Sequence, residues 1–276
     1  MPHTLAIITV IYKNYTILQD FFESINAQTD KNVVIYIADA TPHPQPINYN
    51  GLDIKTFSVE NKGYAHGINT GLKKAIYDGY TTFSIMNCDT ILKNNFVKEV
   101  LRSLQEHPSS IVAGKIYYAS GYEYHKTRYE DKDKGSVIWY AGGNIDQNHA
   151  LTPHIGVDEV DKRQFDSFMP TSFVNGCLMC LDTKVIKTVG LWDESYFLYY
   201  EDADYCERAK IKDVPLFYNP NIVIWHKNAQ STGGPGSSLH LKYQRSSRLK
   251  FGLKYMPLRT KFHLVKNCIL DFLYKR

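Results

Sequence analysis

The feature that most constrains the fold is an alternation, in the first half of the chain, between unbroken apolar runs and segments with helical spacing of apolar residues. The apolar runs cover residues 5–10, 33–38, 54–59 and 81–86, and the helical patterns cover 17–25, 64–77 and 94–106. Strands that are apolar on both faces and alternate with helices are typical of a parallel sheet covered on both sides. The sequence therefore predicts an α/β fold with a mostly parallel sheet flanked by helices.

The second half of the chain is less regular. We expect a long polar loop over 117–135, helices over 183–189 and 202–212, and strands over 173–181, 214–218 and 222–225. A glycine-rich, hinge-like loop at 231–236 precedes a helical extension from residue 239, which should break at Pro257.

Composition describes a globular protein with a polarised charge. The 276 residues are 43% hydrophobic and 22% charged, which excludes disordered, collagen-like and coiled-coil chains. Residues 241–276 hold ten Lys or Arg and one Asp, a net charge of +9, so the overall +4 leaves −5 for the first 240 residues. A basic tail suggests an anionic partner: a phospholipid surface, a nucleic acid or a phosphorylated substrate.

The cysteines and the N-terminal run bear on the compartment. Five cysteines, an odd number scattered through the chain, fit reduced thiols better than a disulfide framework. The apolar run at 5–11 has neither a cationic start nor a small-residue cleavage site, and no run reaches about 18 apolar residues. We therefore expect a cytoplasmic protein without a membrane-spanning segment.

Ligands of such sheets bind beyond the carboxyl ends of the strands, where Asn61 to Gly63 and Asp89 are expected. Gly63, Gly67 and Gly71 recur every four residues, so they either let an anion approach the helix start or only permit tight packing on the sheet. Asp89 follows a buried strand, where it could bind a divalent cation with phosphate oxygens, or serve as a turn or N-cap residue.

Two further segments could carry chemistry. The acidic helix start at 201–204 could simply offset the helix dipole, and its Asp204 can pair with Arg208. Asp202, beside aromatic bulk, is placed to act as a general base with a raised pKa. His226 ends an apolar strand before the glycine-rich loop, as a surface residue or a ligand. Cys177 and Cys180 lie in an apolar pattern typical of core rather than of a zinc site.

The end of the tail has an amphipathic pattern. Phe262, Val265, Ile269 and Phe272 share one helical face, and the lysines lie elsewhere. This pattern fits docking on anionic lipid and equally fits a helix packed on the body with a solvated cationic side.

The order of these motifs along residues 4 to 250 closely resembles the family-2 glycosyltransferases, and within them the rhamnosyltransferase-like branch. The segments that carry the resemblance are Asp39 after the second strand, Asn61 to Gly71, Asn87 to Thr90, Trp139 to Gly143, and Gly190 through Asp204 to His226. The most specific of them is Phe-Leu-Tyr-Tyr-Glu-Asp-x-Asp at 197–204.

The resemblance implies a GT-A fold, which is Rossmann-like, and a nucleoside-diphosphate sugar as donor. By position, Asp39 would contact the base of the nucleotide, and Asn61, Lys62 and Gly63 would line the nucleotide–sugar pocket. Arg245 would reach the diphosphate as the glycine-rich loop closes.

The resemblance also implies the catalytic groups. Asp89 and His226 match the positions that hold Mg²⁺ or Mn²⁺ on the diphosphate, and Asp202 matches the aspartate that deprotonates the acceptor hydroxyl. The chemistry agrees, because a divalent cation stabilises the leaving diphosphate and a hydroxyl needs a base to become a good nucleophile.

The expected protein is thus an inverting glycosyltransferase using a dTDP- or UDP-linked sugar, with rhamnose as one candidate. Its acceptor would be a glycan or lipid-linked glycan of surface polysaccharide biosynthesis, reached from the cytoplasmic face of the inner membrane, and no nucleic-acid partner is expected. We expect a catalytic domain over 1–238, with a nucleotide-binding half to about residue 115 and an acceptor-binding half from 116, followed by a basic helical tail over 239–276. The alternative is a non-catalytic module with the same fold that binds nucleotide sugars or glycans.

The sequence departs from the family pattern at several positions. Asn87 replaces the first carboxylate of the commoner Asp-x-Asp, Cys88 stands where proline is frequent, and Ala40 follows Asp39 where asparagine is usual. The segment around Arg245 only approximates the family's C-terminal arginine motif, so the diphosphate contact lies with either Arg245 or Arg248.

Overall fold

The four apolar runs of the first half form neighbouring parallel strands in the computed structural model, which describes residues 4–125, 127–227 and 238–274. These strands are β1 (Leu5–Ile11), β2 (Val33–Asp39), β3 (Ile54–Ser58) and β4 (Thr82–Met86). β1 pairs in parallel with β2 and β4, and β2 pairs in parallel with β3. The predicted parallel sheet is confirmed for this half of the chain.

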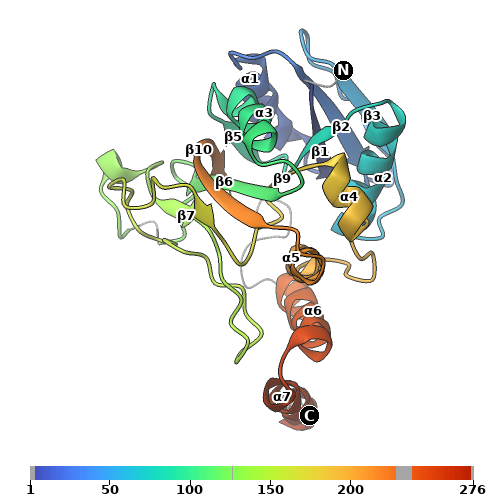
Figure 1. Ribbon diagram of the computed structural model, residues 1–276, viewed down its shortest axis with the longest axis vertical. Coiled ribbons are helices and arrows are strands. Elements are labelled where there is room, and N and C mark those ends of the chain that lie inside the picture. The colour runs from blue at the N-terminus through green and yellow to red at the C-terminus, as the bar shows by residue number, and fades with distance from the viewer. Residues whose placement is uncertain (1–3, 126, 228–237, 275–276) are drawn as a thin grey trace.

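The second half extends the same sheet with mixed strand directions. Its strands are β5 (Thr90–Leu92), β6 (Ile111–Tyr118), β7 (Ile138–Tyr140), β8 (Met169–Pro170), β9 (Leu178–Asp182) and β10 (Leu216–His226). The order across the sheet is β3-β2-β1-β4-β9-β6-β10-β5, with β7 beside β6 and β8 beside β10 (Figure 1). β6 and β10 run parallel, whereas β9 runs antiparallel to β4 and β6.

Helices cover the sheet and extend from it. They are α1 (Leu18–Asn26), α2 (Tyr64–Tyr77), α3 (Phe96–Glu106), α4 (Thr183–Val189), α5 (Glu201–Ile211), α6 (Ser238–Tyr255) and α7 (Leu258–Tyr274). α2 packs on β1 and β2, α3 on β10 and β9, and α4 on β9. α6 and α7, separated at Pro257 as predicted, extend away from the sheet at the lower end of Figure 1.

Three predicted strands differ from the structure. Residues 214–225 form one strand from Leu216 rather than two, with a shift in register between Asn219 and Val223, beside Pro220, which cannot donate a ladder hydrogen bond. The strand predicted over 173–181 begins only at Leu178, because Asn175 folds the chain into a turn in which its Oδ1 accepts a hydrogen bond from the backbone N–H of Cys177 (2.7 Å).

Glycines set how closely α2 lies on the sheet. A Cβ atom added at Gly67 would lie 2.6 Å from Val10 Cγ2, and one at Gly71 would lie 2.6 Å from Ile8 Cγ2. Both distances are impossible for real side chains, so at these two positions the packing interpretation of the glycine pattern holds.

Candidate active site

The carboxyl ends of β2 and β4 carry the first candidate residues on one edge of the sheet. Asp39 is the last residue of β2 and is buried. Its Oδ2 accepts a hydrogen bond from the Tyr15 hydroxyl (2.6 Å) and its Oδ1 accepts one from the Thr41 N–H (2.9 Å). Because only β1 separates β2 from β4, the two strand ends are about 10 Å apart. Asp39 is therefore held in a fixed orientation near the segment that contains Asp89.

Strand pairing brings Asp89 to His226. β5 runs antiparallel to the end of β10 and pairs Thr90 with His226, so the preceding Asp89 lies beside the imidazole. The distance from His226 Nε2 to Asp89 Oδ1 is 3.2 Å, and each residue is only 4% exposed. Within the described residues, neither imidazole nitrogen has a hydrogen-bond partner of good geometry. A buried polar atom without such a partner is costly, and this one is directed at a carboxylate.

This pair fits a divalent cation that also binds phosphate oxygens. Burial by itself would raise the pKa of the Asp89 carboxyl, but the positive charges of His226 and Lys227 hold it below its usual value, so the group stays a carboxylate. Burial would lower the pKa of His226, but Cys177 and Asp89 raise it well above its usual value, so a bound cation would replace the imidazole proton. Carboxylate oxygen suits Mg²⁺ and Mn²⁺, and imidazole suits transition metals. No cluster of three or more potential ligands occurs among residues 4–125, 127–227 and 238–274. Two protein ligands would therefore leave most coordination positions for the diphosphate and water.

Asp202 is held at the start of α5 by backbone hydrogen bonds. Its Oδ2 accepts a hydrogen bond from the Gly176 N–H (2.8 Å) and its Oδ1 accepts one from the Ala203 N–H (2.8 Å). Burial raises the pKa of the Asp202 carboxyl, and these hydrogen bonds only partly offset the effect. The side chain nevertheless keeps partial solvent exposure. A carboxylate with a raised pKa and access to ligand is suited to accept a proton.

The turn before α5 has an unusual backbone conformation. Tyr199 and Tyr200 both adopt left-handed conformations, with φ of 68° and 66°. Such conformations cost roughly 1–2 kcal/mol per non-glycine residue and are concentrated at functional sites. Two in succession stand directly before the acidic helix start and set the direction in which the chain enters α5.

A single short turn connects Asp202 with the Asp89–His226 pair. Gly176 contacts Asp202, and the next residue, Cys177, has its thiol beside His226. The carbonyl of Cys177 accepts a hydrogen bond from the Asn87 N–H (3.2 Å). The structure thus brings the three sequence-predicted residues to opposite sides of the turn 175–177. Cys177 is buried, as predicted for a core cysteine.

The segment from Asn61 to Gly63 lies against the loop that leads into α5. Gly63 has a φ of 105°, and a Cβ atom there would lie 2.3 Å from the carbonyl oxygen of Phe197. That oxygen accepts a hydrogen bond from the Tyr64 N–H (3.0 Å), so this first N–H of α2 is already used. Lys62 is exposed and pairs with Glu60 at 2.7 Å.

The two candidate arginines differ in their surroundings. Arg248 donates hydrogen bonds from Nε and Nη2 to the carbonyl of His149 (3.1 and 2.6 Å). Arg245 is exposed on α6. Two residues before it, the Tyr243 ring stacks on Phe197, in the loop that leads into α5, at 4.6 Å between ring centroids. The glycine-rich loop at 231–236 lies outside the described residues.

Several side chains around the site were not predicted. The Tyr64 hydroxyl donates a hydrogen bond to the carbonyl of Gly176 (3.2 Å), so it braces the turn that holds Asp202. Burial lowers the pKa of His154 to about 4, which keeps it neutral. Its Nδ1 then donates to the Trp139 carbonyl (2.9 Å), and its Nε2 accepts from the Asn175 side-chain amide (3.0 Å). The Trp139 ring also contacts His226, at 4.6 Å between ring centroids.

This sheet, with acidic residues at the carboxyl ends of its strands, has the GT-A fold of the nucleotide-sugar transferases. It resembles the crystal structure of GalNAc-T7 with UDP, GalNAc and Mn²⁺, at a TM-score of 0.65 and 15% sequence identity over 87% of this chain and 47% of that one. The sequence profile of glycosyl transferase family 2 matches residues 6–165, and the chain belongs to this family.

Two curated proteins are similar in sequence to this chain. The chain is 20% identical to the low-salt glycan biosynthesis hexosyltransferase Agl10 of Haloferax volcanii, over 78% of this chain and 64% of that protein. It is 25% identical to the dTDP-rhamnosyl transferase RfbF of Shigella flexneri, over 60% of this chain and 49% of that protein. The chain therefore spans about half to two thirds of the length of these relatives. None of the helices in the described ranges is long and apolar enough to cross a membrane.

Proposed function

We propose that the protein is an inverting, metal-dependent glycosyltransferase that moves a sugar from a dTDP- or UDP-linked donor to a hydroxyl of a glycan or lipid-linked glycan, in surface polysaccharide biosynthesis. Family membership and a relative named for dTDP-rhamnosyl transfer support this proposal and make rhamnose the first candidate sugar. The observation that carries it is that one turn, 175–177, contacts both Asp202 and His226, and that His226 pairs with Asp89.

On the donor side, Asp89 and His226 would hold Mg²⁺ or Mn²⁺. Such a cation, when bound, neutralises the negative charge that grows on the leaving diphosphate. Asp39 would contact the nucleotide base, Asn61 to Gly63 would line the pocket, and Arg245 would contact the diphosphate. The separation of about 10 Å between the ends of β2 and β4 suits a nucleoside diphosphate that spans both.

On the acceptor side, Asp202 would take the proton of the attacking hydroxyl. The hydroxyl oxygen then forms a bond to the anomeric carbon as the bond from that carbon to the diphosphate oxygen breaks. Attack from the side opposite the diphosphate inverts the configuration at the anomeric carbon. We assign nucleotide binding to residues 1–115 and acceptor binding to 116–238, although one continuous sheet joins the two halves.

We further propose that the tail, residues 239–276, docks the enzyme on anionic lipid at the cytoplasmic face of the membrane. Four large apolar side chains of α7 form an exposed stripe on one helical face: Leu258, Phe262, Val265 and Ile269, which are 84%, 68%, 40% and 54% exposed. By helical spacing, Lys261 and Lys266 lie on either side of this apolar stripe. Apolar exposure bordered by cations is typical of an interfacial helix. All five cysteines are unpaired thiols, consistent with a reducing compartment.

Replacement of the proposed base tests the chemistry. Asp202→Asn should lower the rate of metal-dependent nucleoside-diphosphate release by about 10²-fold or more, since proton transfer contributes factors of that order. Donor binding measured by calorimetry should stay within about threefold, because Asp202 lies on the acceptor side. Asp213→Asn is the matched control, since this exposed aspartate just after α5 has a φ of 56°, which asparagine tolerates.

Two results would contradict the proposal. Full turnover in Asp202→Asn would exclude Asp202 as the base. A wild-type chain that binds donor but releases no diphosphate with any acceptor tested would favour the non-catalytic binding module.

A further inference from the structure

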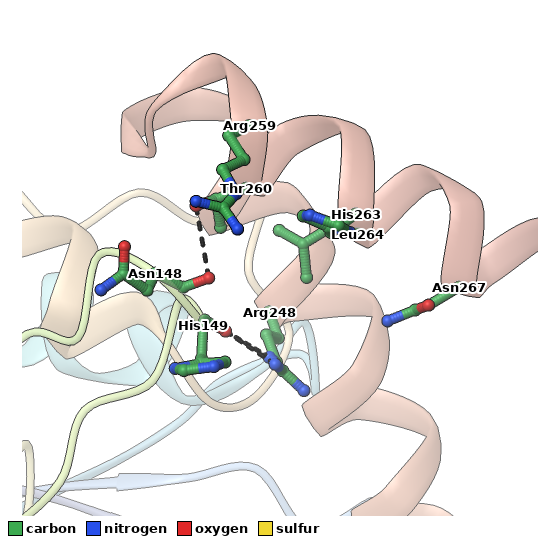
Figure 2. Close-up of a pocket in the computed structure, with 8 residues that line it drawn as sticks. All are labelled: Asn148, His149, Arg248, Arg259, Thr260, His263, Leu264 and Asn267. Carbon is green, nitrogen blue, oxygen red and sulfur yellow. Dashed lines mark hydrogen bonds between the residues drawn. The ribbon is translucent and has the colours of Figure 1, made fainter.

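A pocket, here called the tail pocket, lies between the helices of the tail and the turn at 146–150, and none of its lining residues belongs to the candidate active site. Figure 2 shows this pocket, with α6 and α7 on one side and the turn on the other. Its volume is about 500 Å³, within the range of small-molecule sites.

Hydrogen bonds between elements build the walls of this tail pocket. The Thr260 hydroxyl on α7 donates to the carbonyl of Gln147 (2.9 Å), and Arg248 on α6 donates to the carbonyl of His149. The two helices cross closely, because a Cβ atom on Gly252 would lie 2.1 Å from Leu264 Cδ1. The pocket is therefore a defined space rather than a loose gap between helices.

The lining of the tail pocket is basic. Its ionisable side chains are Arg248, Arg259, His149 and His263, and none of its lining residues is an aspartate or glutamate. The His149 ring pairs with Asp146, just outside the lining (Nδ1 to Oδ2, 2.6 Å), so the two arginines carry the positive charge of the pocket. In Figure 2, Arg248 and Arg259 extend from different helices toward the turn. The planar guanidinium group matches the geometry of phosphate oxygens. The ligand that this lining would recognise is an anion with several acceptor oxygens, of which a phosphoryl group is the best match.

The tail pocket lies where a membrane-bound acceptor could reach it. Thr260, Leu264 and the pocket lie on the side of α7 opposite the apolar stripe, so an α7 bound to lipid would hold the pocket near headgroup level. The turn also reaches the catalytic helix, since the Tyr200 hydroxyl donates to the carbonyl of Ala150 (3.0 Å) and Tyr200 directly precedes Glu201 and Asp202.

We infer that the tail pocket binds a phosphoryl group of a lipid-linked acceptor and so presents its glycan to Asp202. This inference rests on the proposed function. The pocket supplies a recognition element for the acceptor that is separate from the donor's diphosphate site, and it predicts that acceptors lacking a phosphoryl group bind more weakly.

The test measures binding of geranyl diphosphate to the full chain by calorimetry. EDTA and a His226→Ala background keep the probe from the proposed metal site. Arg259→Gln should weaken binding by about tenfold or more, the expected loss for a charged hydrogen bond. Lys261→Gln is the matched control, because it removes one charge from the same helix outside the pocket, and it should stay within about twofold. Inorganic phosphate should compete with the probe.

The outcomes distinguish a lipid-linked acceptor from a lipid headgroup as the source of the phosphoryl group. They also test the tail pocket independently of the proposed reaction. Equal binding by Arg259→Gln and Lys261→Gln would overturn the inference. So would a loss in Arg259→Gln that appears only with phosphatidylglycerol vesicles, since the pocket would then bind lipid headgroups. The binding assay needs no turnover, so a failure of the proposed reaction would leave its result readable.

Discussion

At the residue scale, Asp202 and Glu201 occupy adjacent positions with different surroundings. Glu201 is buried, and its Oε2 has no hydrogen-bond partner within the described residues. Burial, and then the Asp202 carboxylate, raise the pKa of Glu201 well above its usual range. Asp202 instead accepts two backbone hydrogen bonds, which favour its carboxylate form. We infer that Asp202 ionises first while Glu201 still holds its proton.

This difference predicts the pH dependence of the reaction. As the pH falls through the pKa of Asp202, the proposed base becomes protonated, so kcat/KM should drop. Because burial raises that pKa, the acid limb should lie above the value of about 3.9 for a free aspartate. Glu201→Gln should leave the limb in place, because Glu201 is already neutral where Asp202 titrates. An acid limb near pH 4 at saturating Mn²⁺, or a limb that moves by a full unit in Glu201→Gln, would contradict this assignment.

The sequence predicted the charged residues of the candidate site but not the side chains that hold them in place. Asp89 and His226 follow or end predicted strands and Asp202 begins a predicted helix, and their proposed roles come from the resemblance to family-2 glycosyltransferases, because position alone also fits turn, capping or surface residues. Tyr64 and His154 act through hydrogen bonds to the backbone or to Asn175. These bonds depend on contacts between distant segments, which a single sequence does not specify. The motif at 139–143 contributes to the family resemblance but does not reveal that Trp139 packs on His226.

At the element scale, periodicity predicted where the strands of the first half lie but not every pairing. The runs at 5–10 and 33–38 are apolar on both faces, which requires burial inside a sheet. The antiparallel pairing of β5 with β10, which brings Asp89 to His226, joins residues more than 130 positions apart. The three-residue β5 is too short to give a periodic signal. The resemblance implied that Asp89 and His226 lie together, but the strand pairing that brings them together came from the structure alone.

The apolar stripe of α7 is the element with the clearest independent test. Phe262→Ser with Ile269→Ser should reduce partitioning onto vesicles of equal phosphatidylcholine and phosphatidylglycerol by about tenfold or more, since burying each side chain contributes about 1.5–3 kcal/mol. Wild-type binding should also fall as salt rises, because screening weakens attraction to anionic lipid. Co-sedimentation measures both effects.

A matched control uses apolar residues exposed elsewhere. Tyr77→Ser with Ile211→Ser removes side chains that are 90% and 65% exposed on α2 and α5. This variant should bind vesicles like the wild type. Equal loss in both double variants would show that α7 has no special part in lipid binding.

At the scale of the whole molecule, the basic tail is joined to the catalytic unit rather than tethered loosely. The buried carboxylate of Asp204 on α5 accepts hydrogen bonds from Lys254 Nζ (2.5 Å) and the Tyr255 hydroxyl (2.8 Å) on α6. It also pairs with Arg208 at 2.7 Å, as the sequence predicted. The third acid of the motif therefore links α5, which carries the proposed base, to the tail, so a lipid-bound α7 would fix the orientation of the candidate active site above the membrane.

The central claim is that Asp89 and His226 form half of a metal site that a nucleoside diphosphate completes, with Asp202 across from it. Electron paramagnetic resonance of Mn²⁺ with the full chain and UDP or dTDP tests it most directly. We predict tight Mn²⁺ binding only when nucleotide is present, a loss of about tenfold or more in Asp89→Asn and in His226→Ala, and no change in Asp202→Asn. Equal Mn²⁺ binding in the wild type, Asp89→Asn and His226→Ala, or a loss in Asp202→Asn, would contradict the claim.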